Sequence, residues 1–319
     1  MRELTRSNDP VFLSFLTSEL AAAGIEAVSL DGFAASVLEP MNVTAQQRIM
    51  VTEDEYWEAW AVLAEAEDRV REDFLLGGKV RFLQPVEGFR AAIDPVLLAA
   101  SVPAVNGDRV LDVGCGTGAA ALCLLARCPW AWVEGVDVQP DLIALAARSA
   151  ERSGSIERIG FTVADIAGEA VLEGRTFDHV MSNPPFLELG RGRIPVEKAV
   201  ALAKVESTAS LPVWLDFMVA RLKDGGTLSV VHRADRCDEI LAHLGQAGIG
   251  ALKRLELVPM ADGRPVKRCI IQGRKGAAAC DPDVSTLIVH EADGSYTPAA
   301  SAVLREAGAL CLERPPSNP

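Results

Sequence analysis

The sequence has little of what several protein classes require. Only 5% of its 319 residues are aromatic, which argues against an extended base-stacking surface for single-stranded nucleic acid. The seven cysteines include no Cys-x-x-Cys pair, and the four histidines have no metal-ligand spacing. There is no signal-peptide pattern at the N-terminus and no apolar run of membrane-spanning length. We therefore expect a cytoplasmic protein with reduced thiols and no metal.

The negative charge of the chain is unevenly distributed. The formal net charge is −13, yet residues 1–73 alone hold 5 Lys/Arg against 15 Asp/Glu. The N-terminal segment is therefore a poor candidate for contact with phosphates. The remainder is close to neutral, so the overall charge does not exclude a nucleic acid substrate for it.

A glycine-rich turn follows a short apolar segment at 109–113, which reads as a buried strand, and precedes a predicted helix at 118–127. The turn is Gly114-Cys115-Gly116-Thr117-Gly118. Glycines between a strand and a helix let a ligand approach the backbone amides at the helix N-terminus. Asp137 closes the next predicted strand, where a carboxylate suits ribose hydroxyls. These features fit either a nicotinamide dinucleotide or S-adenosylmethionine.

Two further aspartates favour S-adenosylmethionine. Asp112 lies two residues before the first glycine, where it would repel a pyrophosphate but accommodate the ammonium group of this cofactor. Asp165 ends a predicted strand at 161–165 and is expected either to accept a hydrogen bond from the cofactor's adenine or to cap the next turn. The predicted cofactor-binding residues are Asp112, Gly114, Gly116, Gly118, Asp137 and Asp165.

A second motif, Asn183-Pro184-Pro185-Phe186, follows another predicted strand. The nitrogen lone pair of an adenine amino group or a glutamine amide is delocalised, so this nitrogen is a poor nucleophile. The side-chain oxygen of Asn183 and the carbonyl of Pro184 can accept hydrogen bonds from its two N–H groups and stabilise the charge that develops on the nitrogen. The prolines stiffen the turn, and Phe186 offers a flat face for a planar substrate. We predict methyl transfer to a planar NH2 group, with these four residues as the catalytic set.

The motif leaves the substrate open. An adenine in tRNA, a glutamine amide of a translation release factor and a guanine amino group of ribosomal RNA all present a suitable nitrogen. A cofactor-binding regulator is the non-enzymatic alternative, but a sensor would not need acceptors for a target nitrogen. The plainest alternative is a Pro-Pro turn with a buried phenylalanine.

Basic residues gather after the second motif and near the C-terminus. They are candidates for contact with the RNA backbone, although charged residues on late strands and turns are also ordinary solvated surface. The candidates are Arg191, Arg193, Lys267, Arg268, Arg274 and Lys275.

Five further segments, at 76–85, 88–100, 231–236, 290–291 and 294–298, accompany the two motifs. Together they resemble the tRNA1(Val) (adenine-N6)-methyltransferase family from about residue 73 to the end. The resemblance implies that the target adenine beside the anticodon lies against the Asn-Pro-Pro-Phe segment and that the three aspartates hold the cofactor. Phe186 replaces the commoner tyrosine, and Val205 stands where histidine is frequent.

The order of elements from residue 109 onward predicts an α/β domain, which we place at residues 73–319. Strands alternate with helices, which is typical of a parallel sheet covered on both faces. The resemblance implies a class I methyltransferase fold, Rossmann-like, with a mostly parallel seven-stranded sheet. We expect its last strand at 267–272, and we expect helices to start at Asp94-Pro95 and Thr297-Pro298.

Residues 1–72 read as a separate βαββα unit, with Asp9-Pro10 capping its first helix. This unit resembles a small prokaryotic signal-transducing domain with an α+β, ferredoxin-like fold. It carries no obvious chemistry, and we expect it to serve regulation, a protein partner or dimerisation.

Overall fold

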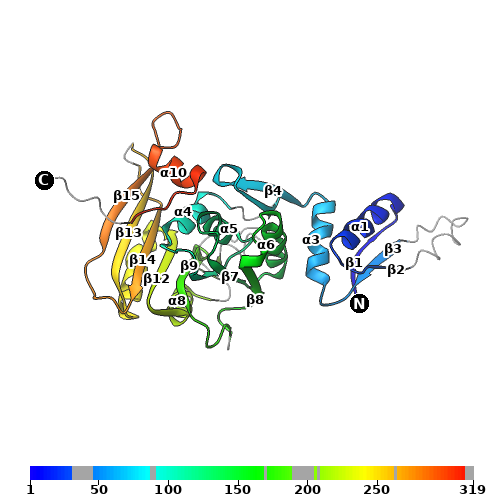
Figure 1. Cartoon of the computed structure of the whole chain (residues 1–319), viewed down its shortest axis with the longest axis horizontal. Coiled ribbons are helices and arrows are strands. Elements are labelled where there is room, and N and C mark those ends of the chain that lie inside the picture. Colours follow the sequence, from blue (N-terminus) through cyan, green and yellow to red (C-terminus); the bar gives the residue numbers. More distant parts are fainter. Residues whose placement is uncertain are drawn as a thin grey trace, which may run out of the picture. The chain divides into compact units, whose positions relative to one another are not determined.

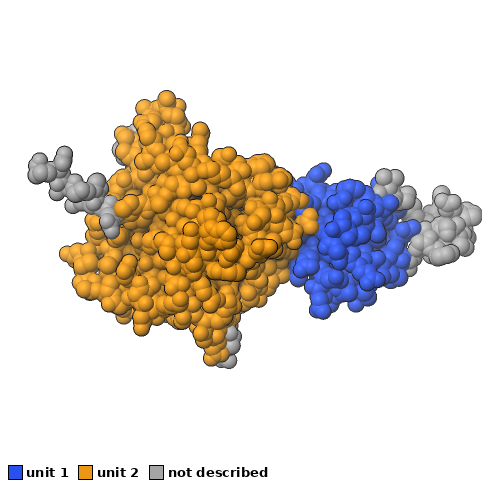
Figure 2. All heavy atoms as spheres, viewed as in Figure 1, with its two compact units in different colours: residues 1–71, 85–87 blue, residues 72–84, 88–319 orange. Residues whose placement is uncertain are grey.

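The computed structural model describes residues 1–30, 46–86, 91–168, 171–188, 205–206, 209–261 and 264–312. The chain divides into two compact units, which Figure 2 colours separately. One comprises residues 1–71 and 85–87, and the other comprises residues 72–84 and 88–319.

The described residues of the smaller unit contain elements in the order β, α, β, β, α. Its elements are β1 (Arg2–Ser7), α1 (Pro10–Ala22), β2 (Val28–Leu30), β3 (Gln47–Val51) and α3 (Tyr56–Ala66). The strands form an antiparallel sheet in the order β1-β3-β2. Asp9 caps α1 as predicted, because its Oδ1 accepts a hydrogen bond from the Phe12 N–H at 3.1 Å. Leu16, Leu20 and Ile49 are fully buried in the core of this unit.

The larger unit contains a mixed sheet of eight described strands, labelled in Figure 1. The sheet order is β15-β13-β14-β12-β9-β6-β7-β8. All neighbouring pairs are parallel except those on either side of β14. The strands are β6 (Arg109–Val113), β7 (Trp132–Asp137), β8 (Ile159–Val163), β9 (Phe177–Ser182), β12 (Leu222–Arg233), β13 (Ile249–Met260), β14 (Arg268–Lys275) and β15 (Asp283–His290).

The predicted count of seven strands and the predicted last strand are both wrong. β14 occupies the place expected for the last strand, but β15 follows it and pairs with β13 at the edge of the sheet. The burial of β15 alternates along much of its length, with exposed Val284 and Ile288 and buried Leu287 and Val289.

Helices cover both faces of this sheet (Figure 1). Successive side chains of the central strands alternate between two cores, so Val110 packs on one face and Leu111 on the other. The helices are α4 (Ile93–Ser101), α5 (Ala119–Arg127), α6 (Pro140–Arg152), α8 (Leu211–Ala220), α9 (Cys237–Gln246) and α10 (Pro298–Glu306). Short 3-10 turns are η2 (Leu76–Gly78), η3 (Ile156–Arg158) and η4 (Ala234–Arg236).

Two further pairs of short strands are present in the described chain. One is β4 (Val70–Leu75) with β5 (Val80–Pro85), and the other is β10 (Leu187–Glu188) with β11 (Val205–Glu206). β10 begins directly after Phe186 and runs parallel to β11. Residues 189–204, between these two strands, fall outside the described residues.

Two predicted helix starts have different outcomes. Thr297 caps α10 as expected, because its Oγ1 accepts a hydrogen bond from the Ala300 N–H at 3.2 Å. Asp94 was expected to cap α4, and this is wrong. The helix begins at Ile93, and the Asp94 carboxylate instead accepts a hydrogen bond from Arg268.

The cysteines correct a further expectation. Cys237, at the start of α9, and Cys269, near the start of β14, form a disulfide. They are far apart in the sequence, but both are fully buried where α9 packs on the sheet, so spacing alone did not reveal the pair. The other five cysteines are free thiols.

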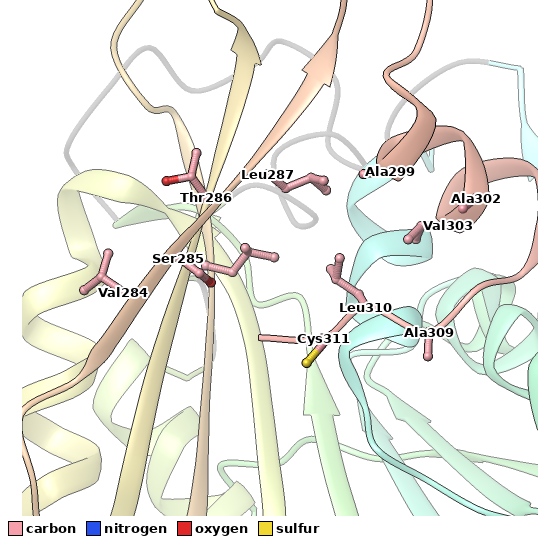
Figure 3. A pocket seen from close by; sticks show the side chains of 11 residues that line it. Val284, Ser285, Thr286, Leu287, Ala299, Ala302, Val303, Ala309, Leu310 and Cys311 are labelled. Atoms are coloured by element: carbon pink, nitrogen blue, oxygen red, sulfur yellow. The ribbon is translucent and has the colours of Figure 1, made fainter. Parts of the chain in front are cut away.

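A cavity of about 670 Å³ lies between β15 and α10 (Figure 3). Its lining is mainly aliphatic, with Leu287, Val303 and Leu310 pointing into it and Cys311 beside them. The cavity is at the β15 edge of the sheet, whereas the glycine turn follows the central strand β6. Its lining contains no residue of the glycine turn or of the Asn-Pro-Pro-Phe turn.

Candidate functional site

The glycine turn and the Asn-Pro-Pro-Phe turn follow the carboxyl ends of two neighbouring strands, and these ends lie side by side. β6 and β9 are parallel and adjacent, and Val113 pairs in register with Ser182. The chain order reverses here, since β7 lies on the other side of β6. Ligands of open α/β sheets bind in the crevice at such a switch point, beyond the carboxyl ends of the strands. The structure therefore brings the two predicted motifs together.

The glycines of the first turn are required by its backbone. Gly114, Gly116 and Gly118 have φ values of 70°, 53° and 80°, in the left-handed region that favours glycine. The N–H of Gly114 donates to the Val136 carbonyl at 2.8 Å, which fastens the turn to β7. A Cβ atom on Gly114 would lie 2.7 Å from the ring of Trp214, so this position also lacks space for a side chain.

Asp137 supports this turn from β7. Its Oδ2 accepts a hydrogen bond from the Gly116 N–H and its Oδ1 one from the Gln139 N–H, each at 2.9 Å. Burial raises the pKa of the carboxyl, and the two backbone donors partly offset this effect. The ribose contact inferred from the sequence stays a prediction, and the structure adds a role in holding the turn.

Replacing Asp137 with alanine is expected to weaken binding of S-adenosylhomocysteine by roughly tenfold or more, because the glycine turn loses its anchoring acceptor. Calorimetry on the purified variant measures this directly. Asp165→Ala is a comparison at the end of the next strand. Unchanged affinity in Asp137→Ala would exclude a binding role for this carboxylate.

Asp112 is buried beneath the glycine turn without a compensating charge. It is 2% exposed, and its Oδ2 has no hydrogen-bond partner among the described residues. Burial, with a smaller contribution from the charge of Asp137, raises the pKa of Asp112 to about 7. A buried carboxylate is costly unless a cation accompanies it. The residues present therefore fit a ligand whose ammonium group reaches this carboxylate.

Asp165 lies just beyond the end of β8 and is half-buried. Its Oδ1 accepts a hydrogen bond from the Ala167 N–H at 2.9 Å, so the alternative of a turn-capping aspartate is present in the structure. Contact with a cofactor adenine stays a prediction.

The second turn is anchored below Asn183. The Ser182 hydroxyl donates to the Val113 carbonyl at 2.7 Å and accepts from Nε1 of Trp214 at 2.7 Å. Asn183 Oδ1 is buried and has no hydrogen-bond partner in the part of the chain that the structure describes. A buried acceptor without a partner costs free energy, so this oxygen is suited to a hydrogen bond from a ligand N–H group.

Phe186 is contacted by two side chains from other strands. The ring of His232, at the end of β12, meets it edge-on with centroids 5.3 Å apart. The guanidinium carbon of Arg268, at the start of β14, lies 4.3 Å from the Phe186 ring centroid. Arg268 Nε donates to Asp94 Oδ2 at 3.2 Å, so α4 also reaches this point.

His232 is fully buried, and neither ring nitrogen makes a hydrogen bond within the described chain. Burial lowers the pKa of its ring to about 4, and the positive charge of Arg236 adds to this, while the backbone of Pro185 opposes it. The ring is therefore neutral at physiological pH.

Sequence reasoning missed three residues of this site. Trp214 joins the two turns, but a tryptophan in an apolar helix reads as core. His232 and Asp94 lie within the resembling segments, yet His232 carried no expected role there and Asp94 was expected only to start a helix. Their partners come from strands or helices remote in the sequence, and no spacing rule links them.

The basic candidates have different outcomes. Lys267 is exposed and directly precedes Arg268, at the end of β14 that lies near Phe186. Arg274 and Lys275 lie at the other end of β14, because this strand runs antiparallel to β12. Lys275 Nζ donates to the carbonyls of Val219 and Leu222, so it serves packing and is not brought to the site. The two remaining candidates, Arg191 and Arg193, lie outside the described residues.

Comparison with known proteins decides the class. The family described as "Methyltransferase domain" matches residues 110–201, which include both turns. A solved structure titled a "predicted O-methyltransferase" from Agrobacterium tumefaciens superposes with a TM-score of 0.54 at 25% identity, covering 68% of this chain and 98% of that one. The chain is a class I methyltransferase. Its fold and its enzyme class are therefore as predicted.

Curated relatives extend the similarity over most of the chain. A "tRNA1(Val) (adenine(37)-N6)-methyltransferase" of Shewanella amazonensis is 26% identical over 221 residues, covering 69% of this chain and 91% of the relative. One of Porphyromonas gingivalis, with the same name, is 29% identical over 222 residues, covering 66% and 84%. The expected resemblance to this family is confirmed. Residues 1–67 match the family described as "Putative prokaryotic signal transducing protein", which confirms the second resemblance.

Two negative findings concern the described residues alone. They contain no group of His, Cys, Asp and Glu side chains arranged to hold a metal ion. None of their helices combines the length and the apolar character needed to cross a membrane.

Proposed function

We propose that this methyltransferase transfers a methyl group to the exocyclic N6 of an adenine in tRNA, beside the anticodon. The observation that carries the proposal is Asn183 Oδ1, a buried acceptor without a partner, at the switch point next to the cofactor turn. The names of the curated relatives support the choice of tRNA. We place the reaction in the cytoplasm, where its substrate would be met.

The acceptors on the second turn act on the target nitrogen. Asn183 Oδ1 accepts a hydrogen bond from one N–H of the amino group, and the Pro184 carbonyl accepts one from the other N–H. These two hydrogen bonds direct the nitrogen lone pair away from the acceptors and stabilise the positive charge that develops on the nitrogen. The fixed φ angles of Pro184 and Pro185 hold these acceptors before the substrate arrives. Phe186 packs against the flipped base. No general base is needed before transfer, because the methylated amino group loses its proton readily.

The first turn is suited to S-adenosylmethionine, which supplies an electrophilic methyl group on a sulfonium. Asp112 would pair with the ammonium of the methionine moiety, which satisfies the orphaned Oδ2. Asp137 would hold the ribose, and Asp165 the adenine amino group. Gly114, Gly116 and Gly118 let the ligand approach the backbone.

Lys267 would contact phosphates, and we propose that residues 1–72 serve a protein partner or dimerisation.

The test is transfer of labelled methyl groups from S-adenosylmethionine into total tRNA, ribosomal RNA and cytosolic protein from cells lacking this gene. Label recovered from tRNA as N6-methyladenosine supports the proposal. Label in a protein of release-factor size, with none in tRNA, would identify a glutamine-amide methyltransferase. Label recovered from ribosomal RNA as N2-methylguanosine would identify the third candidate reaction.

Phe186 offers a graded test of base packing. Phe186→Tyr keeps the flat ring and is expected to change kcat/KM by less than about threefold, whereas Phe186→Ala should lower it roughly 10- to 100-fold, since one base–aromatic stack contributes about 1–3 kcal/mol. Steady-state kinetics with one purified tRNA measures both. Equal activity of Phe186→Ala and the parent enzyme would contradict a stacking role.

A further inference from the structure

Phe186 has no hydrogen-bonding group, so its ring can be held only through packing. A tyrosine at this position could be fixed through its hydroxyl, and that option is absent here. The ring that the target base would meet must therefore be oriented by its neighbours. Two of them approach it from strands at the same edge of the sheet, His232 against it edge-on and Arg268 near its centroid.

Arg268 is also held by a contact with α4. Its Nε donates to Asp94 Oδ2 at 3.2 Å, and Asp94 is fixed in the first turn of α4. The Arg268 side chain is 34% exposed and that of Asp94 is 18% exposed, so the pair is partly shielded from solvent. The guanidinium thus connects α4, β14 and the catalytic turn. A side chain kept mobile to meet phosphates would have no use for this ion pair.

We propose that Arg268, oriented by Asp94, is a positioning residue that fixes the ring of Phe186 for stacking of the target base. This inference rests on the proposed function, since it assigns a task to the same turn. Arg268 lies near the ring centroid and the carboxylate holds the guanidinium there. Arg268 therefore acts mainly on the geometry of transfer, and its contribution to RNA affinity is secondary.

Lys267 provides a matched control. It precedes Arg268, is exposed at the same edge, and carries the same charge. It makes neither the Phe186 contact nor the Asp94 hydrogen bond described for Arg268. Removing Lys267 tests loss of one positive charge at this edge, whereas removing Arg268 tests loss of charge together with loss of ring positioning.

The experiment compares Arg268→Ala, Arg268→Lys, Asp94→Asn and Lys267→Ala in the full chain. It measures kcat, KM for one purified tRNA at several salt concentrations, and the Kd for S-adenosylhomocysteine. We expect Arg268→Ala to lower kcat about tenfold or more, because the target base is then no longer aligned for methyl transfer. Its Kd for S-adenosylhomocysteine should stay within about threefold. Asp94→Asn should lower kcat less than Arg268→Ala does. The kcat of Arg268→Lys should lie between those of these two variants.

Lys267→Ala is expected to keep kcat and to raise KM with a flatter salt dependence, as for loss of one phosphate contact. If Arg268→Ala reproduces this behaviour, Arg268 is a phosphate ligand and the inference is wrong. An unchanged kcat in all three Arg268 and Asp94 variants also overturns it. Should Arg268→Ala not fold, Arg268→Lys and Asp94→Asn still decide. A parent enzyme inactive on tRNA defeats the proposed function instead, and the same comparison is then made on the substrate found.

Discussion

Asn183→Ala is expected to lower kcat by roughly 100- to 1000-fold, the cost of removing one well-placed acceptor from a site of developing charge. Because Asn183 lies on the second turn, while the cofactor turn is fastened through Val136 and Asp137, binding of S-adenosylhomocysteine should be retained. Single-turnover kinetics and calorimetry on the same preparation measure the two quantities. Loss of cofactor binding in this variant would show that the division of labour between the turns is wrong.

A second substitution tests whether the side-chain oxygen is what matters. Asn183→Asp keeps an acceptor oxygen in place and should retain more activity than Asn183→Ala. Thermal unfolding of both variants controls for damage to the turn. Equal losses in both, with stability unchanged, would remove the acceptor role from this account.

Asp112→Asn should bind S-adenosylhomocysteine at least tenfold more weakly and yet unfold at higher temperature than the parent protein without ligand at pH 8. Burial raises the folded-state pKa of Asp112 to about 7, against an ordinary value of 3.8. A shift of this size corresponds to roughly 4 kcal/mol of lost stability above the folded pKa. Asparagine removes the charge, although its own buried NH2 group offsets part of the gain.

The sign of this effect depends on pH. Between about pH 4 and 7 the folded state binds more protons at Asp112 than the unfolded state does, so this group lowers stability as the pH rises. The advantage of Asp112→Asn should therefore grow over this range and level off above pH 7. Saturating S-adenosylhomocysteine should reverse the order, because its ammonium stabilises only the aspartate. A stability difference independent of pH would mean that Asp112 is not a buried anion.

The motifs could be predicted from the sequence because each is local. Glycines with positive φ and an Asn-Pro-Pro turn can be recognised from a few consecutive residues. Parallel strands then place both turns at the carboxyl ends of the same sheet. Their meeting followed from fold class alone. The two turns thus needed no knowledge of side-chain packing.

What surrounds the turns could not be predicted in this way. Asp94 resembled a helix cap, yet its carboxylate serves Arg268, and this depends on the register of an antiparallel strand. The same register carries Lys275 to the opposite edge, although it lies near Arg268 in the sequence. Trp214 gave no signal beyond hydrophobicity. Such contacts depend on strand order and direction, which no local pattern encodes.

The most direct test of methylation at the adenine amino group uses two tRNA molecules that differ only in the presence of that group. One carries adenine at position 37, and the other carries purine there, with hydrogen in place of the amino group. Incubated with the enzyme and labelled S-adenosylmethionine, the first should gain label recovered as N6-methyladenosine, and the second should gain none. Equal label in both would contradict methylation of that amino group.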